Sequence, residues 1–177
     1  MISPLSPGAI SNALKELDVW PACVKIEIME TTRGGYTLSI CTNRAPGFFD
    51  ITDEVMDAVA ESGIGDGMAL VYSRHTTAAI KINEHEPLLI EDMEDFLTRI
   101  APPDEYYQHN DFDVRTANMT PDEQPNGHAH CQHLLLSASE TIPVSNGRLD
   151  LGTWQRIFLV ELDRPRPREV LIKVIGA

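Results

Sequence analysis

Basic residues, cysteines and long hydrophobic runs are all scarce in this sequence. Lysine and arginine together number 14 against 27 aspartate and glutamate residues, which gives a formal net charge of -13. This balance disfavours a non-specific nucleic-acid or anionic-membrane binder, because such proteins hold phosphates with clustered basic side chains. No apolar run approaches the roughly 20 residues that a membrane-spanning helix requires. We therefore expect neither a nucleic acid nor a membrane among the partners.

Cysteine is limited to three positions. Cys23, Cys41 and Cys131 form an odd set without a CxxC pair, which argues against a disulfide framework and against a thiolate zinc site. The first residues also lack a basic segment followed by an apolar core, the pattern of a secretory signal. Both observations lead us to expect a reducing, cytoplasmic environment.

Length and composition predict one folded domain. The chain has 177 residues, of which 42% are hydrophobic, and about 100–200 residues is the usual size of a domain. Residues 1–20 are poorly patterned and are interpreted as an N-terminal arm, which leaves residues 21–177 as the domain. The whole negative charge falls within residues 45–113, where acids outnumber bases sixteen to three. Two amphipathic helices with acidic faces, at about 50–61 and 87–101, account for much of it.

Strand patterns surround these helices. Alternating apolar and polar residues predict strands at Val24–Ile28 and Tyr36–Thr42, joined through a turn at Thr32–Gly35. The Asn146-Gly147 pair predicts a tight hairpin. Short apolar runs predict further strands at Met68–Tyr72, Ala78–Ile82, Ile157–Glu161 and Val170–Val174. The sequence therefore predicts an α+β fold, in which a mainly antiparallel sheet or sandwich carries two or three packed helices.

The six histidines define the candidate site, since all of them lie between residues 75 and 133. His128, His130 and His133 fall in a predicted short helix, His75 follows a buried strand, and His109 lies in a long polar loop. Neutral imidazole is the commonest metal ligand and the usual acid–base group near pH 7. Histidines from three segments can build an open zinc site with water in the fourth position. Because no HExxH motif is present, the spacing also permits solvated or capping histidines.

The residues that follow His75 favour a ligand site. Thr76 and Thr77 place two hydroxyl groups beside the imidazole, and hydroxyls can donate to phosphate or carboxylate oxygens. The alternative is that both threonines only bridge neighbouring strands through local hydrogen bonds. Asn83 and Glu84 lie at the far end of the next strand, and the sequence leaves open whether they approach His75.

Three motifs resemble the YjbQ family, also known as UPF0047. They are HTTAAIKINE at 75–84, NGHAH at 126–130 and GRLDLGTWQRIFLVELDRPRPREV at 147–170. The resemblance covers roughly residues 20–177 and implies a compact, β-rich α+β domain that assembles as a homotrimer. It also implies a weak, secondary thiamine-phosphate synthase activity, which has been described for some members. One departure is Arg164, which stands where the family has glycine and changes a turn in a segment expected to contact phosphate.

The resemblance also implies roles for single residues. It assigns a metal-binding cleft to His75, His109 and His130, where we expect a divalent metal, zinc by the imidazole chemistry, with magnesium as the other candidate. The expected catalytic residues are Glu84 as general base, Asn83 to orient the substrate, and Asp92. The expected substrate-binding residues are Thr76, Thr77, Arg148 and Gln155.

These expectations describe a metal-binding enzyme that acts on a small phosphorylated metabolite. Arg148, Arg164, Arg166 and Arg168 supply guanidinium groups that can neutralise a leaving pyrophosphate. A histidine-bound zinc suits a metal-dependent hydrolase equally well, because zinc activates water. A non-catalytic metal or metabolite binder with structural histidines is the other alternative. Trp154 is expected to pack in the core or in a subunit interface, with stacking on a cofactor as the alternative.

Overall fold

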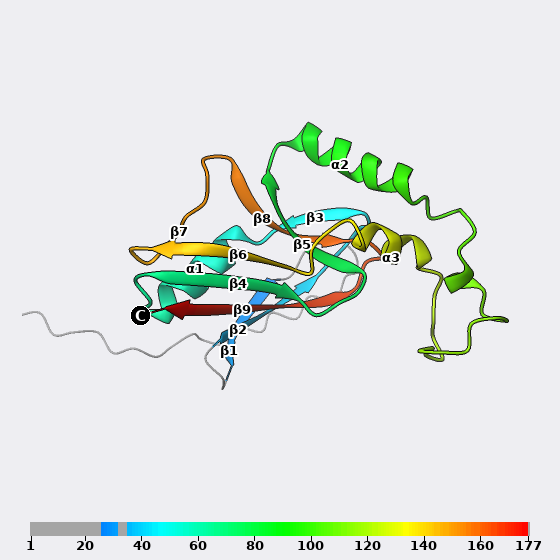
Figure 1. The fold of residues 1–177 in the computed structure, drawn as a ribbon, viewed down its shortest axis with the longest axis horizontal. Coiled ribbons are helices and arrows are strands. Elements are labelled where there is room, and N and C mark those ends of the chain that lie inside the picture. Colours follow the sequence, from blue (N-terminus) through cyan, green and yellow to red (C-terminus); the bar gives the residue numbers. More distant parts are fainter. Residues whose placement is uncertain (1–25, 32–34, 177) are drawn as a thin grey trace, which may run out of the picture.

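Two antiparallel sheets organise the chain in the computed structural model, which describes residues 26–31 and 35–176 (Figure 1). The predicted N-terminal arm and Cys23 lie outside the described residues. The large sheet has the strand order β1 (Ile26–Thr31), β2 (Gly35–Cys41), β9 (Pro167–Gly176), β4 (Gly67–Ser73), β6 (Ser139–Ser145) and β7 (Arg148–Leu149). The small sheet has the order β3 (Gly47–Asp50), β8 (Gln155–Glu161) and β5 (Ala78–Glu84). The helices are α1 (Thr52–Ser62), α2 (Pro87–Ile100), the single 3-10 turn η1 (Gln108–Asn110) and α3 (Gly127–His133).

The predicted α+β architecture with mainly antiparallel strands is confirmed. Helix α2 begins at Pro87, as predicted, because the Glu86 carboxylate accepts hydrogen bonds from the N–H groups of Leu88 and Leu89 at 3.0 and 2.7 Å. Helix α1 begins at Thr52 and not at residue 50, because Asp50 ends a strand that the sequence analysis did not predict. The predicted turn at Thr32–Gly35 lies mostly outside the described residues.

The connections between strands decide where the candidate residues lie. Asn146 and Gly147 have positive φ values of 53° and 73° between β6 and β7, as the predicted tight hairpin requires. Strands β4 and β5 do not pair with each other, because β4 pairs with β6 and β9 whereas β5 pairs with β8. Residues 74–77 therefore cross from the large sheet to the small sheet, and we call this segment the crossover.

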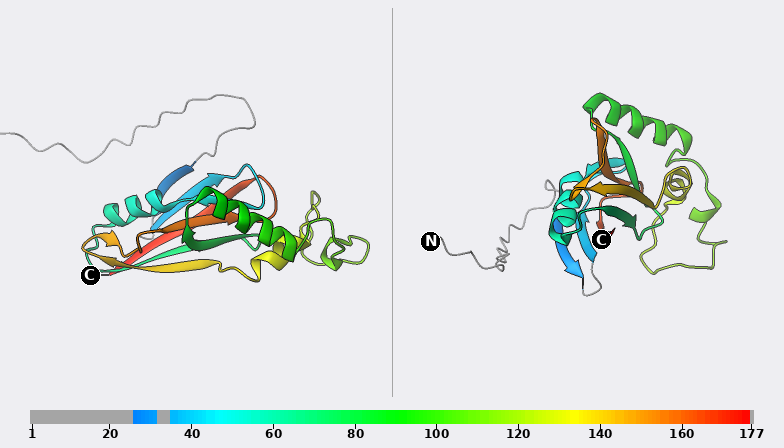
Figure 2. Two further views of the ribbon diagram at one scale, coloured as in Figure 1. Left: turned by 90° about the horizontal axis from the view of Figure 1, so that it is seen from above. Right: turned by 60° about the vertical axis from the view of Figure 1, so that its left-hand side comes forward.

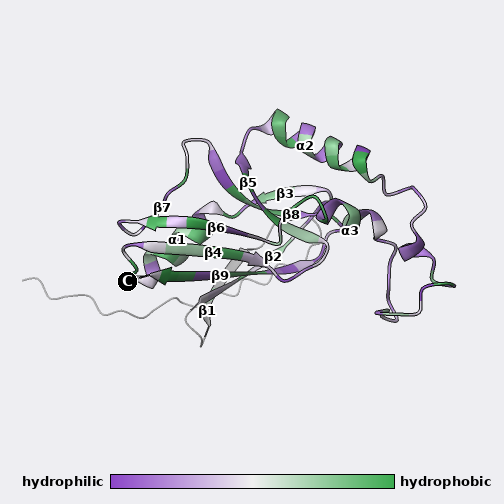
Figure 3. Cartoon of the chain, viewed as in Figure 1, coloured by the Kyte–Doolittle hydropathy of each residue, from purple (hydrophilic) through white to green (hydrophobic). Residues whose placement is uncertain are grey.

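Two clusters of buried side chains form most of the core. The largest cluster of buried side chains fills the space between the large sheet on one side and the small sheet with α1 on the other. A second cluster, including Phe158 and Ile90, packs α2 and α3 against the other face of the small sheet (Figure 2). Hydrophobic segments concentrate in the strands, whereas the loop at 101–126 is mainly hydrophilic (Figure 3). No helix of the described residues has the length and hydrophobicity needed to span a membrane.

Trp154 corrects one prediction about the core. It is 71% exposed in the loop before β8. Of the two expected places, the core of the chain is therefore wrong, and the subunit interface stays a prediction. The outer face of the large sheet also leaves Met68, Tyr72 and Ile175 exposed. Cys41 and Cys131 are free thiols.

Candidate functional site

One cavity of about 910 Å³ lies where the crossover, the long loop, α3 and the start of β9 meet. Its volume falls within the range of about 300–1,000 Å³ that is typical of small-molecule sites. We call it the histidine–arginine cavity, because its lining includes His75, His109, His130, Arg74, Arg115, Arg166 and Arg168. The three histidines that were predicted to act together thus line one cavity, although they come from three separate segments.

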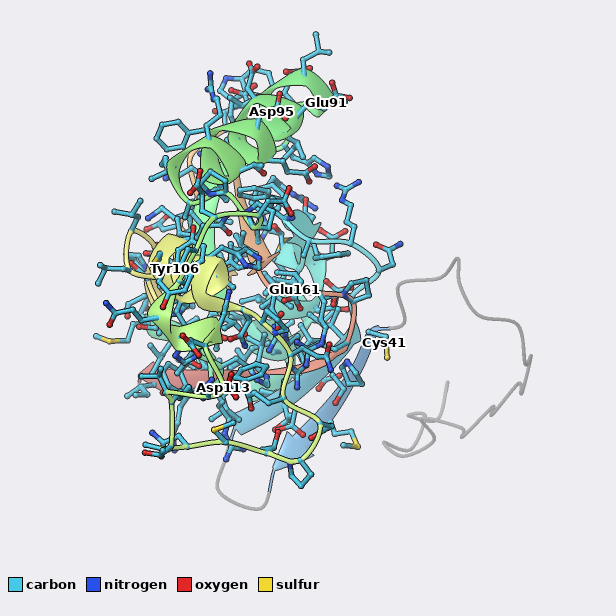
Figure 4. All side chains as sticks on the ribbon, turned by 90° about the vertical axis from the view of Figure 1, so that its right-hand side faces the viewer. Cys41, Glu91, Asp95, Tyr106, Asp113 and Glu161 are labelled. Carbon is cyan, nitrogen blue, oxygen red and sulfur yellow. The ribbon has the colours of Figure 1, made fainter. Side chains whose placement is uncertain are left out.

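A buried ion pair supports one wall of this cavity, which Arg168 lines and Glu161 does not. Glu161 is 0% exposed and Arg168 is 3% exposed, and Glu161 is labelled near the middle of the view in Figure 4. Arg168 Nε donates to Glu161 over 2.6 Å, while Arg168 Nη2 donates to the second oxygen of Glu161 and to Thr77 Oγ1. Thr42 and the two backbone N–H groups after Glu161 also donate to this carboxylate. These bonds hold the guanidinium of Arg168 in one orientation at the cavity wall.

The neighbouring arginines share another carboxylate. Arg164 and Arg166 both donate to Asp163 over 3.0 and 3.1 Å, and the Asp163 side chain is only 2% exposed. Arg164, the departure from the family pattern, thus pairs with Asp163 and does not line the cavity, whereas Arg166 does. The run of arginines and prolines at 164–168 is not a fully exposed edge, because Arg168 is buried.

His75 is fixed by a backbone hydrogen bond. Its Nε2 accepts the N–H of Glu169 over 2.9 Å, so this nitrogen carries no proton and Nδ1 carries it instead. Burial lowers the pKa of His75, and the Arg168 guanidinium lowers it further. His75 is therefore a neutral imidazole near pH 7, with Nδ1–H as its remaining donor.

The ring of His109 on η1 contacts the ring of His130 on α3. Their ring centroids are 4.6 Å apart in an edge-on arrangement. His109 Nε2 is buried and has no hydrogen-bond partner among the described residues. Burial lowers the pKa of His130, and the nearby His109 lowers it further. Asn110 Oδ1 ties η1 to α3, because it accepts the N–H groups of Asn126 and Gly127 over 3.0 and 2.8 Å.

Gly127 explains why the loop can approach α3 so closely. A Cβ atom at this position would lie 2.5 Å from the Tyr107 Cβ, which is closer than real contacts allow. His128 and His133, also on α3, lie near the backbone of Leu162 and Ala78 respectively, and His128 Nδ1 and His133 Nε2 are buried without a partner among the described residues. Neither histidine lines the cavity.

The other predicted site residues lie away from the cavity. Glu84 faces Gln155 across β5 and β8, at the opposite end of β5 from the crossover. Six residue steps of strand separate Ala78 from Glu84, and at about 3.3 Å per residue these ends are roughly 20 Å apart. Five of the predicted catalytic and substrate-binding residues do not line the cavity: Asn83, Glu84, Asp92, Arg148 and Gln155. Within one copy of the chain, Glu84 therefore cannot act on a ligand bound beside His75.

Sequence reasoning missed several residues of the cavity. Arg115 holds the long loop together, since its guanidinium donates to the carbonyl oxygens of His109 and Asn118 and to Glu123 over 3.3, 2.7 and 3.2 Å. Asn126 lines the cavity with a side chain that is 9% exposed. Only the NGHAH motif, which contains Asn126, gave a sequence signal for this residue.

The described residues do not fit a centre of three imidazoles. His109 and His130 lie close enough to share a ligand, but Nε2 of His75 is occupied by the Glu169 N–H, so only Nδ1 would remain. No three His, Cys, Asp or Glu side chains within residues 26–31 and 35–176 are placed to hold a metal ion. The divalent metal stays a prediction.

Comparisons with known proteins give the family. Residues 36–177 match the family described as UPF0047 protein YjbQ-like. A UPF0047 protein from Methanothermobacter thermautotrophicus is 42% identical over 78% of this chain and 90% of its own length. The UPF0047 protein YugU of Bacillus subtilis is 38% identical over 79% of this chain and 98% of its own length.

Solved structures agree with the sequence relatives. A YbjQ-like protein of unknown function from Sulfolobus solfataricus superposes with a TM-score of 0.71 at 35% identity, covering 88% of this chain and all of its own. A YjbQ/UPF0047 family protein from Clostridium acetobutylicum superposes with a TM-score of 0.69 at 39% identity, covering 78% of this chain and 98% of its own. The two-sheet fold and the motifs that form the histidine–arginine cavity are thus those of a known group, and the chain belongs to the UPF0047 (YjbQ-like) family.

Proposed function

We propose that the histidine–arginine cavity binds a small phosphorylated metabolite and that the protein is an enzyme acting on it. One observation carries this proposal: four arginines line a single cavity of a chain whose net charge is -13. Among the described residues that line it, Glu123 is the single acid, and its carboxylate accepts a hydrogen bond from Arg115. Guanidinium groups bind phosphate oxygens in pairs, so this wall suits a phosphate or pyrophosphate.

The surrounding groups are suited to displacement of a phosphorylated leaving group. Fixed guanidinium groups stabilise negative charge as it develops on a leaving pyrophosphate. Neutral imidazoles beside them can donate or accept a proton near pH 7. Formation of thiamine phosphate, in which a thiazole phosphate displaces pyrophosphate from a pyrimidine pyrophosphate, belongs to this class. We therefore propose weak thiamine-phosphate synthase activity as one reaction of the cavity.

Binding of inorganic pyrophosphate tests the proposal most directly. Arg166→Gln removes one cavity guanidinium and should weaken pyrophosphate binding about 10- to 100-fold, because a charged hydrogen bond contributes roughly 1.5–3 kcal/mol. Arg99→Gln, on the exposed face of α2, is the matched control and should leave affinity unchanged. Isothermal titration calorimetry of the full chain measures both. Absence of binding to the unsubstituted chain, or equal losses in both variants, would contradict the proposal.

A divalent metal is the second part of the proposal. The observation that favours it is His109 Nε2, which is buried without a partner among the described residues and lies beside His130. Bound there, a metal would supply a Lewis acid to phosphate oxygens. Elemental analysis of the purified chain should find it at about one equivalent, and His109→Ala should lose it while His85→Ala, outside the cavity, retains it. A metal-free chain after incubation with zinc and magnesium would exclude this part alone.

A further inference from the structure

We propose that His75 binds the phosphate of the cavity's ligand as a neutral hydrogen-bond donor, through Nδ1–H, and that it is neither a metal ligand nor a general base. The inference rests on the proposed function and assigns one named contact within it. The ligand group that this contact recognises is an acceptor without a proton of its own, such as an ionised phosphate oxygen.

One hydrogen bond decides which nitrogen of His75 carries the proton. The Glu169 backbone N–H can only donate, so His75 Nε2, which lies 2.9 Å from it, must accept. A neutral imidazole has a single N–H, which is then on Nδ1. Burial and the Arg168 guanidinium both favour the neutral form, because both lower the pKa of His75.

Contacts on either side of His75 keep the imidazole in this position. The crossover is held against the start of β9, where Arg74 pairs with the Glu169 carboxylate over 3.5 Å. On the other side of His75, Thr77 Oγ1 accepts a hydrogen bond from Arg168 over 3.0 Å. The ring therefore keeps Nε2 against β9, which fixes where Nδ1–H lies.

Nδ1 of His75 is open to a ligand. No described residue makes a hydrogen bond with this nitrogen, and it is not buried, in contrast to Nε2 of His109. His75 lines the cavity, so a ligand bound there can reach the N–H. Water satisfies such a donor in the unliganded protein, and a phosphate oxygen can take the place of that water.

The neighbours of His75 on the cavity wall supply the positive charge. Arg166 and Arg168 line the same cavity, and the charge of each guanidinium acts on the imidazole. Arg168 uses Nε and Nη2 to bind Glu161 and Thr77, whereas no described residue accepts a hydrogen bond from its Nη1. This wall thus offers a phosphate a charged donor and a neutral donor side by side.

The bond to Glu169 excludes two other roles for His75. A metal ligand or a general base needs a ring nitrogen with a free lone pair. In His75 that lone pair, on Nε2, is taken by the Glu169 N–H, and the other tautomer would break this bond. The expected centre of three histidines therefore loses His75, and any metal of the cavity would be held without it.

Nuclear magnetic resonance tests the tautomer on the unsubstituted, isotope-labelled full chain. Long-range proton–nitrogen correlation spectra distinguish a protonated ring nitrogen from an unprotonated one, and loss of signals in His75→Gln assigns those of His75. We expect Nδ1 protonated and Nε2 unprotonated, with and without inorganic pyrophosphate, and a shift of the Nδ1–H signal when pyrophosphate binds. An Nε2–H tautomer, or an Nδ1–H signal that does not respond, would overturn the inference.

Two substitutions separate the donor of His75 from its anchor. His75→Gln keeps an acceptor at the place of Nε2 for the Glu169 N–H but removes the donor. Pyrophosphate should bind it about tenfold more weakly, which corresponds to about 1.4 kcal/mol, while the melting temperature stays nearly unchanged. His75→Asn keeps a donor at the place of Nδ1 and removes the anchor, so it should melt at a lower temperature yet bind within about threefold of the unsubstituted chain. His85→Gln, outside the cavity, is the matched control and should bind pyrophosphate normally.

The order of the two variants decides between a binding and a structural role. If His75 were only structural, His75→Asn would lose both stability and affinity, and His75→Gln neither. Unchanged pyrophosphate affinity in His75→Gln would overturn the inference but leave the proposed function intact. Zinc bound by the unsubstituted chain and lost in His75→Gln would show a metal ligand and also overturn it. Failure of pyrophosphate to bind the unsubstituted chain would overturn the proposed function, and the inference with it.

Discussion

Replacing Glu161 with glutamine should lower the free energy of unfolding by about 3–5 kcal/mol, because it leaves the Arg168 guanidinium buried without its counter-charge. The two side chains are 0% and 3% exposed, so solvent cannot replace the lost charge. The carboxylate also accepts hydrogen bonds from Thr42 and from two backbone N–H groups, which would meet an amide in its place. This one substitution should therefore affect stability and the cavity wall together.

Urea denaturation followed by circular dichroism measures this loss, and the melting temperature should fall by roughly 6–20 °C for a domain of this size. Arg74→Gln is the control, because the Arg74–Glu169 pair is exposed and 3.5 Å long and such pairs contribute about 0–1 kcal/mol. The double variant Glu161→Leu with Arg168→Met should recover much of the loss, since apolar groups tolerate burial. A loss below about 1 kcal/mol in Glu161→Gln would show that the pair is not desolvated as described.

Mild acid should also destabilise the fold, through histidines and before the carboxylates titrate. Burial lowers the pKa of His75, His128, His130 and His133 from the ordinary value of 6.5. The folded chain therefore binds fewer protons than the unfolded chain below pH 6.5. Stability is fully present above that pH and is lost as the pH falls toward the folded-state pKa values.

The expected size follows from proton linkage. Each proton taken up on unfolding contributes up to about 1.4 kcal/mol per pH unit, so the unfolding free energy should fall by on the order of 1 kcal/mol between pH 6.5 and 5.5. Chemical denaturation at a series of pH values measures the slope, and His133→Gln should reduce it. Asp50 and Glu123, whose pKa values are lowered from 3.8 and 4.5, act only at lower pH. Burial raises the pKa of Glu54 and Glu94 from 4.5, so these two oppose the loss at the acid end of the range. A flat profile from pH 7.5 to 5.5 would refute the role of the histidines.

Much of the fold could be predicted because local patterns agree with it. Pro87 and the polar residue before it mark the start of α2, and Asn146-Gly147 marks a hairpin. Strand β3 escaped prediction because four residues, Gly47–Asp50, are too few to show a period. The placement of β4 and β5 in different sheets depends on pairing with β6, β8 and β9, which no local pattern contains.

The candidate site was predicted in part. His75, His109 and His130 do line one cavity, but Glu84 was associated with His75 because the two lie close in sequence. An extended strand advances by about 3.3 Å per residue, so Glu84 and His75 lie far apart in space although they are close in sequence. The burial of Arg168 against Glu161 was equally hidden, because it depends on contacts from Thr42 and Thr77. The metal and the homotrimer stay predictions.

The position of β9 in the large sheet affects how the chain folds during translation. This strand lies between β2 and β4 in the large sheet, yet it follows both of them by about a hundred residues or more in the sequence. During synthesis, β2 and β4 therefore each keep one unpaired edge until residues 167–176 have left the ribosome. Such unpaired strand edges can pair with strands of other chains. Nascent chains stalled before β9 should accordingly be targets for chaperones, and release of the last strand should trigger closure of the sheet and, with Arg168, of the cavity wall.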